Sequence, residues 1–285
     1  MKRLFAAILC LCLLAGCGRT DSTGNTCRAE DEPTVGAEKA EPIGESFRII
    51  QEKPDWLLLA KEEGGSAEVY TLSLRDVELT LDGNAFDRNE PGAYQSFPDG
   101  TLTGALVEVA YDLVLETYPG QLAGVTAVNL RSDGFDDLCA LYLRVLNDLW
   151  AVDEGLNSAI TMLSVDLSQT GLSASEQAAV AWAFAGAHGI SDPLTLSYEE
   201  LAAEGYLSDT APEVDGIPHW KDGCLFTIAE QEAENNGRGG TGGTVTFDAQ
   251  KWRSALGADF FTDCTASRDA KGHWGDYAIG GQAIS

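Results

Sequence analysis

Histidine is the side chain best suited to acid–base or metal chemistry, and the three histidines of this chain stand far apart. His188, His219 and His273 belong to no H-E-x-x-H pattern, and no two of them are close in sequence. No serine occurs in a G-x-S-x-G or S-x-x-K pattern, so the sequence predicts no nucleophile elbow. Cys139 falls on the apolar side of a predicted helix, which favours a core thiol over a nucleophile. We therefore predict no catalytic residue and no metal site.

Two further segments contain residues that resemble ligand-binding loops. Residues 237–242 fit G-x-G-x-x-G, but they lie between two predicted strands, whereas a dinucleotide loop needs a strand before it and a helix after it. Residues 82–93 are rich in side-chain oxygens but lack the glycine and the final acid of an EF-hand loop. The two segments are interpreted as a hairpin loop and a solvated turn, so no cofactor is predicted.

The tryptophans are the more suggestive residues for binding. Trp220, Trp252 and Trp274 flank the predicted C-terminal strands. Indoles that meet in one pocket stack on sugars or apolar ligands, and indoles also fill the cores of domains of this size. Both readings stay open, and these three tryptophans are the candidate ligand-binding residues. Adjacent acids such as Asp136 and Asp137 keep a hydrolase reading open, because glycosidases use paired carboxyl groups.

The charge of the chain excludes one class of partner. Its 285 residues include 45 acids and 18 Lys and Arg, which gives a formal net charge of -27 at pH 7. Such a chain repels the phosphates of nucleic acids, so we expect no nucleic-acid partner. The acidity is most simply interpreted as favouring solubility outside the cell. A more specific interpretation is that the acids bind cations.

The N-terminus has the pattern of a secretory signal. Lys2 and Arg3 precede an apolar run of 11 residues, Leu4–Leu14. A membrane-spanning helix needs about 20 such residues. Residues 18–44 have almost no apolar side chains and cannot bury enough surface to offset the entropy of ordering.

The end of this signal resembles a bacterial lipobox. The four residues are Leu14-Ala15-Gly16-Cys17. The resemblance implies that Cys17 receives a diacylglyceryl group and that residues 1–16 are then removed as a signal peptide. Residues 17–44 are then a disordered acidic tether. The chain is expected to be lipid-anchored at the extracytoplasmic face of the cell membrane.

Residues 45–131 show the alternating pattern of short strands. Val107–Asp112, Leu115–Gln121 and Val125–Val128 resemble the closing strands of an OB-like domain found in Gram-positive extracytoplasmic lipoproteins of unknown function. The resemblance implies a small OB-like β-barrel for residues 45–131. It implies no catalytic residue.

Residues 132–285 are predicted to form an α+β domain. Apolar residues recur with helical spacing over 138–150, and Asp136 and Asp137 fall in the first turn, where the helix dipole favours acids. Capping boxes open two more helices, at Ser173-x-x-Glu176 and Ser197-x-x-Glu200. Several strands follow, so we expect three helices covering an antiparallel sheet. A Cys224–Cys264 disulfide and buried thiols are both compatible with the spacing.

These patterns favour a membrane-anchored lipoprotein that binds a ligand or partner at the cell surface without catalysis. A cell-wall component or another protein is the expected partner. The alternatives are a hydrolase directed at the cell wall and a structural accessory of a membrane complex.

Overall fold

The computed structural model describes residues 43–63, 66–210, 215–231 and 243–285. Residues Ala40–Ser285 form one compact unit. Cys17, the signal, most of the tether and the G-x-G-x-x-G segment lie outside the described residues. No helix among the described residues is long and apolar enough to cross a membrane.

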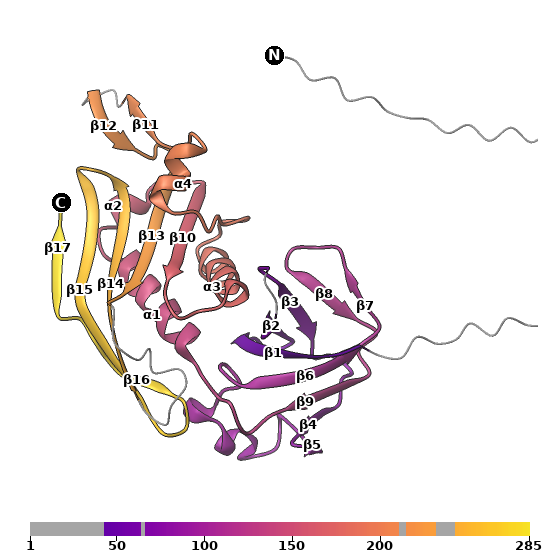
Figure 1. The fold of residues 1–285 in the computed structure, drawn as a ribbon. Helices are drawn as coiled ribbons and strands as arrows, with labels where there is room; N and C mark the ends of the chain where they lie inside the picture. The colour runs from indigo at the N-terminus through magenta and orange to yellow at the C-terminus, as the bar shows by residue number, and fades with distance from the viewer. Residues whose placement is uncertain (1–42, 64–65, 211–214, 232–242) are drawn as a thin grey trace, which may run out of the picture. The chain divides into compact units, whose positions relative to one another are not determined.

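The described residues form two sheets and four helices, an α+β architecture as expected (Figure 1). The first sheet has nine described strands in the spatial order β5-β4-β9-β6-β1-β2-β3-β8-β7. Their bounds are β1 (Ile43–Glu52), β2 (Trp56–Lys61), β3 (Val69–Ser73), β4 (Leu79–Leu81), β5 (Asn84–Phe86), β6 (Leu106–Tyr111), β7 (Leu113–Leu115), β8 (Gly120–Ala123) and β9 (Ala127–Leu130). Two short 3-10 helices, η1 (Ala93–Ser96) and η2 (Pro98–Gly100), precede β6.

The first sheet is open, which corrects the prediction of a small closed barrel. Its edge strands are β5 and β7, and no pairing joins them in the described part of the chain. Each edge strand has only three residues, too few to make the staggered ladder that closes a barrel.

The central strands of this sheet are buried on both faces. In β2, Leu57 and Leu59 join one apolar cluster, while Leu58 and Ala60 join another. Residues buried on both faces give a continuous apolar run in place of alternation, as in Trp56–Ala60. The second of these clusters also contains the helices α1 and α3.

The second sheet follows α1 (Leu138–Ala151) and α2 (Glu154–Asn157). Its strands pair in the order β10-β13-β14-β12-β11, and β15 pairs with β14, β16 and β17. The bounds are β10 (Met162–Gln169), β11 (Ser208–Thr210), β12 (Asp215–His219), β13 (Gly223–Glu230), β14 (Gly243–Ser254), β15 (Gly257–Arg268), β16 (Trp274–Ala278) and β17 (Gly281–Ile284). Helices α3 (Ala174–Ala187) and α4 (Tyr198–Ala203) lie between β10 and β11 in sequence.

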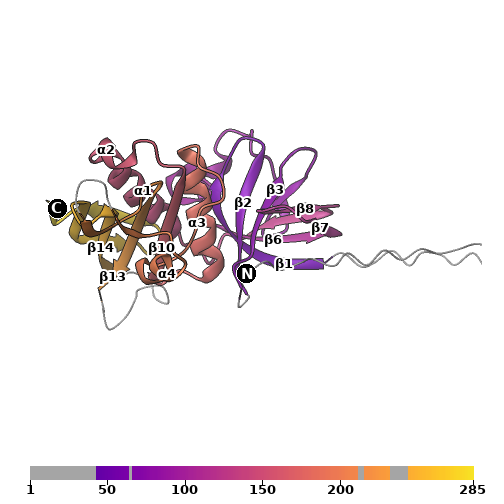
Figure 2. The same ribbon diagram turned by 90° about the horizontal axis from the view of Figure 1, so that it is seen from above.

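The second sheet is mixed, and this corrects the predicted antiparallel sheet. β10 and β13 pair in parallel, because α3 and α4 carry the chain back to the starting end before β13 begins. The described residues also hold a fourth helix, the one-turn α2. Figures 1 and 2 show α1 and α3 between the strands of the second sheet and β1–β3 of the first.

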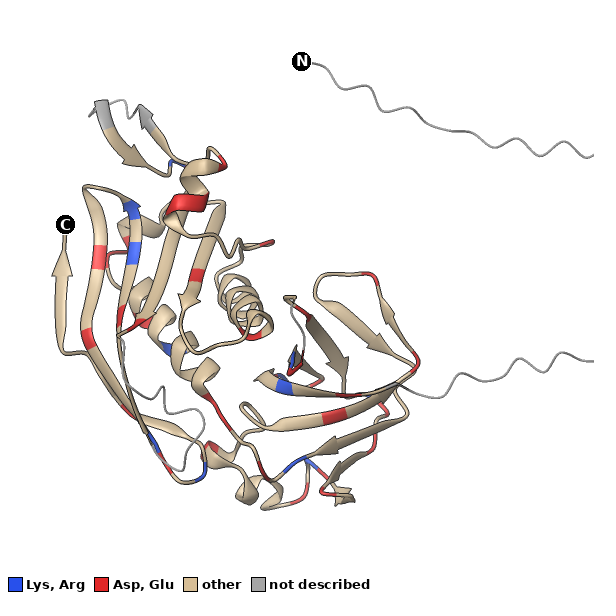
Figure 3. Cartoon of the chain, in the orientation of Figure 1, with Lys and Arg blue, Asp and Glu red and all other residues tan. Residues whose placement is uncertain are grey.

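Several local predictions are confirmed. α1 covers the expected residues, and both predicted capping boxes are formed, at Ser173 with Glu176 and at Ser197 with Glu200. Cys139, Cys224 and Cys264 are buried, and the Cys224–Cys264 disulfide is not formed. The acidic residues are spread over both sheets (Figure 3).

Candidate functional site

Two buried acids precede helix α1 and connect it to the far end of the chain. Asp136 Oδ1 accepts a hydrogen bond from the Leu138 backbone N–H, at 3.1 Å. The side chain of Asp137, the N-cap residue, makes no capping hydrogen bond. Both acids are more than nine-tenths buried, and both accept a hydrogen bond from Trp274, the first residue of β16. The main role of these acids is therefore to connect the start of α1 to β16, rather than to interact with the helix dipole.

Asp137 holds His273 in a fixed orientation. Its Oδ2 lies 2.6 Å from His273 Nδ1, and its Oδ1 accepts the Trp274 backbone N–H at 2.7 Å. Burial raises the pKa of Asp137 despite these hydrogen bonds, which lower it. Burial also acts to lower the pKa of His273, but Asp137, Asp99 and Asp269 outweigh it and the net shift is upward. The pair is a hydrogen-bonded imidazole and carboxylate.

The second nitrogen of this imidazole faces another carboxylate. His273 Nε2 lies 3.5 Å from Asp99 Oδ2. Asp99 is in η2, where it adopts a left-handed backbone with φ of 54°, and its side chain is 67% exposed. One potential ligand atom from each of Asp99, Asp137 and His273 lies within 4.8 Å of the other two. The three side chains come from segments more than 30 residues apart in sequence.

The turn that carries His273 is fixed by its own hydrogen bonds. Asp269 Oδ1 accepts the backbone N–H groups of Lys271, at 2.8 Å, and of His273, at 3.0 Å. Gly272 has φ of 93°, and a Cβ at this position would lie 1.9 Å from the carbonyl oxygen of Phe135. Only glycine allows this close approach. The turn and the segment before α1 are thus held in contact.

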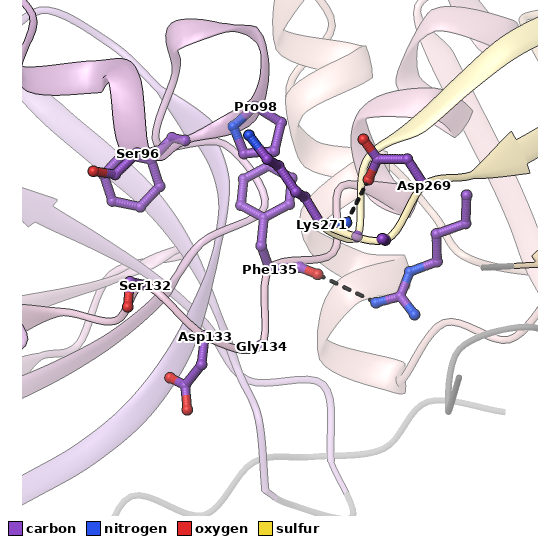
Figure 4. A pocket seen from close by; sticks show the side chains of 12 residues that line it. Ser96, Pro98, Ser132, Asp133, Gly134, Phe135, Asp269 and Lys271 are labelled. Carbon is purple, nitrogen blue, oxygen red and sulfur yellow. Dashed lines mark hydrogen bonds between the residues drawn. The ribbon is translucent and has the colours of Figure 1, made fainter. Parts of the chain in front are cut away.

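A cleft of about 460 Å³ lies beside this cluster. Three segments line it: Ser96–Pro98, Ser132–Phe135 and Arg268–Gly272. Arg268 Nη2 donates to the Phe135 carbonyl at 3.2 Å and lies 3.6 Å from Asp136 Oδ2. Figure 4 shows the Lys271 side chain extending across the cleft toward Pro98. Asp99 and His273 directly adjoin lining residues in sequence, so the cluster flanks the cleft.

The predicted tryptophans do not meet in one place. Trp220 and Trp252 are buried in a small apolar cluster with Leu201 and Leu225. Trp274 is buried in the larger cluster that contains α1 and α3. None of the three lines the cleft, and their contact with a ligand stays a prediction.

The other two histidines lie elsewhere. His188 is the C-cap residue of α3, as expected, and its ring stacks on Trp150 with centroids 3.8 Å apart. Burial lowers the pKa of His188, which favours the neutral imidazole over the positive one expected from the helix dipole. His219 lies at the end of β12.

Sequence reasoning missed the combination of Asp99, Asp137 and His273. The first two looked like a turn acid and a helix-dipole acid, and the histidine stood alone. The one available signal was the adjacent pair Asp136-Asp137 before an apolar helix, although a pattern of this kind identifies no distant partner. The chain matches no protein-family model, no curated protein and no solved structure at a significant level.

Proposed function

We propose that this protein is a lipid-anchored extracytoplasmic protein that binds a small ligand in the cleft between Phe97, Phe135 and Lys271. The observation that carries the binding function is the cleft itself. Its volume of about 460 Å³ lies within the range of ligand pockets in proteins, about 300–1,000 Å³. The anchor is supported by the lipobox at Leu14–Cys17 in the sequence.

The walls of the cleft are pre-organised. Arg48, on β1, donates from Nη1 to the carbonyl oxygens of Gly104, at 3.0 Å, and Gly134, at 2.8 Å. The Phe135 carbonyl accepts a hydrogen bond from Arg268 Nη2. A cleft whose backbone is already fixed loses little entropy when a ligand binds.

The side chains of the cleft favour a ligand with an apolar part and an anionic group. Phe97, Pro98 and Phe135 line the cleft. The two phenylalanines are buried and Pro98 is half-buried, so Pro98 is the most accessible of these apolar side chains. Within the described part of the chain, the Lys271 ammonium group has neither an ion pair nor a hydrogen bond. A cation of this kind can bind a carboxylate or phosphate, although Asp133 and Asp269 in the same cleft limit how much negative charge it accepts.

The binding proposal is tested with the full chain purified in detergent. A panel of small carboxylates and phosphates with apolar groups, including cell-wall fragments, is screened by thermal shift and then by calorimetry. We expect a member of the panel to bind and its affinity to fall at least tenfold in Lys271→Glu and in Ser132→Trp, which fills the cleft. Lys221→Glu is the matched control, since Lys221 lies outside the cleft. A panel without a binder, or a binder indifferent to both cleft variants, contradicts the proposal.

The anchor is tested separately. Lipidation of Cys17 is measured by metabolic labelling with a fatty-acid analogue, and Cys17→Ser is expected to lose the label and leave the membrane fraction. Equal label in the variant rules out Cys17 as the anchor. Two acyl chains hold a protein stably at a membrane, where one alone is marginal.

A hydrolase directed at the cell wall is the second candidate, and the His273–Asp137 pair favours it. A histidine oriented by a carboxylate is the usual arrangement for general-base catalysis. In the described residues, however, the atom facing His273 Nε2 is an oxygen of Asp99, and no serine or cysteine hydrogen-bonds to the imidazole. If the purified chain hydrolyses peptidoglycan and His273→Ala abolishes this activity, the hydrolase becomes the preferred function over ligand binding.

A further inference from the structure

We propose that Asp99 and His273 bind a divalent transition-metal ion, with Asp137 as the carboxylate that orients the histidine. The inference stands on the three side chains alone. It depends neither on the lipid anchor nor on the ligand of the neighbouring cleft.

The hydrogen bond to Asp137 sets the tautomer that a metal ligand needs. Asp137 accepts from His273 Nδ1, so in the neutral imidazole the proton lies on Nδ1 and the lone pair lies on Nε2. Metal-binding histidines in proteins commonly donate their other ring N–H to a carboxylate in this way. Asp137 is in turn fixed by the Trp274 backbone N–H. The lone pair of Nε2 is therefore available for a metal ion, and Asp99 Oδ2 lies 3.5 Å from this nitrogen.

The spacing of the two ligand atoms suits a metal ion. Zinc bonds to imidazole nitrogen and carboxylate oxygen are about 2.0–2.2 Å long, and tetrahedral geometry then separates the two ligand atoms by about 3.4 Å. His273 Nε2 and Asp99 Oδ2 are 3.5 Å apart. This separation matches the one expected for two ligands of a tetrahedral zinc ion.

Access and charge also favour this position. The Asp99 side chain is 67% exposed and that of His273 is 26% exposed, so an ion reaches the pair from solvent. Three acids interact with His273, namely Asp99, Asp137 and Asp269, and their charge attracts a cation. Two protein ligands, one fewer than in catalytic zinc sites, leave the remaining coordination positions to water or to an added ligand.

The ligand types select among cations. An imidazole nitrogen suits Zn²⁺, Ni²⁺ and Cu²⁺, whereas Ca²⁺ and Mg²⁺ prefer sites made of oxygen atoms alone. We therefore expect Zn²⁺ to bind and Ca²⁺ and Mg²⁺ not to compete at equal concentration.

The test uses the full chain in detergent after treatment with EDTA and removal of the chelator. Titration with ZnCl₂ by calorimetry is expected to give one site per chain that is lost in His273→Ala and weakened at least tenfold in Asp99→Ala. Asp137→Asn is expected to weaken Zn²⁺ by about 10–100-fold, the usual effect of removing an orienting partner. His188→Gln is the matched control, since His188 contacts Trp150 and Asn147 and no member of the cluster.

A second measurement guards against loss of the fold. Asp99 is exposed but has a left-handed backbone with φ of 54°, so Asp99→Ala should melt somewhat below the EDTA-treated parent. Zn²⁺ should raise the melting temperature of the parent but not of the variant. The visible spectrum of bound Co²⁺ should show nitrogen and oxygen ligation without a thiolate charge-transfer band, which separates this site from cysteine thiols. No binding by the parent, or binding unchanged in both Asp99→Ala and His273→Ala, overturns the proposal.

Discussion

The indole Nε1–H of Trp274 donates a hydrogen bond of 3.0 Å to Oδ1 of Asp136, across 138 residues of sequence. Both side chains are buried. The bond joins the first residue of β16 to the segment before α1, next to the bond between His273 and Asp137. The tryptophan thus has a structural partner at the position where the sequence suggested a ligand.

We predict that Trp274→Phe destabilises the protein by about 1–3 kcal/mol, because a buried carboxylate then loses a hydrogen-bond donor. The free energy of unfolding is measured by denaturant titration. Trp182→Phe is the control, since the Trp182 indole makes no hydrogen bond to another described residue and lies at the edge of the core. Equal effects of the two substitutions would show that the bond to Asp136 contributes no more than the loss of ring volume.

The sequence could predict helix α1, which follows Asp136, but not the tryptophan that bonds to this acid. Helical periodicity located α1 to within one residue, and the S-x-x-E patterns located both capping boxes, because those signals lie within a few residues of each other. The pairing of Asp136 with Trp274 has no local signal. It depends on where β16 lies after the whole second sheet has formed.

The errors in the predicted fold also concern contacts between segments that are distant in sequence. The strands of residues 45–131 were recognisable from alternation, but closure of a barrel depends on whether the edge strands β5 and β7 pair, and they do not. The parallel pairing of β10 and β13 depends on the path of the chain through α3 and α4. Sequence patterns report what each segment buries and say little about which segment lies beside it.

A second prediction concerns the ion pair between Lys251 and Asp259, which is fully buried. Lys251 Nζ lies 3.4 Å from Asp259 Oδ2 and also donates to the carbonyl oxygens of Val152 and Asp153. Lys251→Met leaves the carboxylate without this cation, and we expect a loss of about 3–5 kcal/mol in the free energy of unfolding.

The double variant K251M/D259N separates charge from packing. It removes both charges, so it should be more stable than Lys251→Met alone. Lys221→Met, at an exposed lysine, is the control and should change the unfolding free energy by less than about 0.5 kcal/mol. A double variant less stable than Lys251→Met would mean that the carboxylate is not the source of the loss.

The third prediction is a pH dependence of stability from Glu45. Burial acts to raise the pKa of this carboxyl, but hydrogen bonds from Lys61, at 2.8 Å, and from Tyr111 outweigh it and lower the pKa overall. A carboxyl whose pKa is lower in the folded chain stabilises the fold above its unfolded pKa, about 4.3. That contribution disappears as the pH falls through the folded pKa.

Glu45→Gln removes the titrating group and keeps an acceptor oxygen for Lys61. We expect the parent to be more stable than this variant at pH 7 and the difference to vanish toward pH 2–3, about one to two units below the unfolded pKa. Denaturant titrations at several pH values measure it. A difference that is constant over this range would contradict the linkage.

The fourth prediction concerns the buried thiols. Burial raises the pKa of Cys224 to about 12 and that of Cys264 to about 11, so neither forms a reactive thiolate near neutral pH. In the folded chain we expect Cys139, Cys224 and Cys264 to resist alkylation by iodoacetamide, and in denaturant we expect all three to react. Peptide mass mapping without reduction identifies them. A Cys224–Cys264 disulfide in that map would contradict the unbridged, buried thiols of the structure.

The last prediction concerns the fragment of residues 132–285, which the sequence suggested as a separate domain. One apolar cluster joins Leu58 and Val69 of the first sheet to Val180 and Phe184 of α3. Arg48 of β1 lies 3.5 Å from the buried carboxylate of Glu176 on the same helix. The fragment would expose this face of α3 to water and lose that cation.

We therefore expect the fragment of residues 132–285 to have helical and strand content by circular dichroism but no cooperative thermal transition. The fragment of residues 40–285, which is one compact unit, should melt in a single step. Arg48→Met in this longer fragment is the intermediate case. This substitution removes the cation beside Glu176 but keeps the apolar contact between the first sheet and α3. If the variant melts at a lower temperature but still in a single step, the apolar cluster and not the ion pair makes unfolding cooperative. A cooperative transition in the short fragment would instead show that residues 132–285 fold without the first sheet.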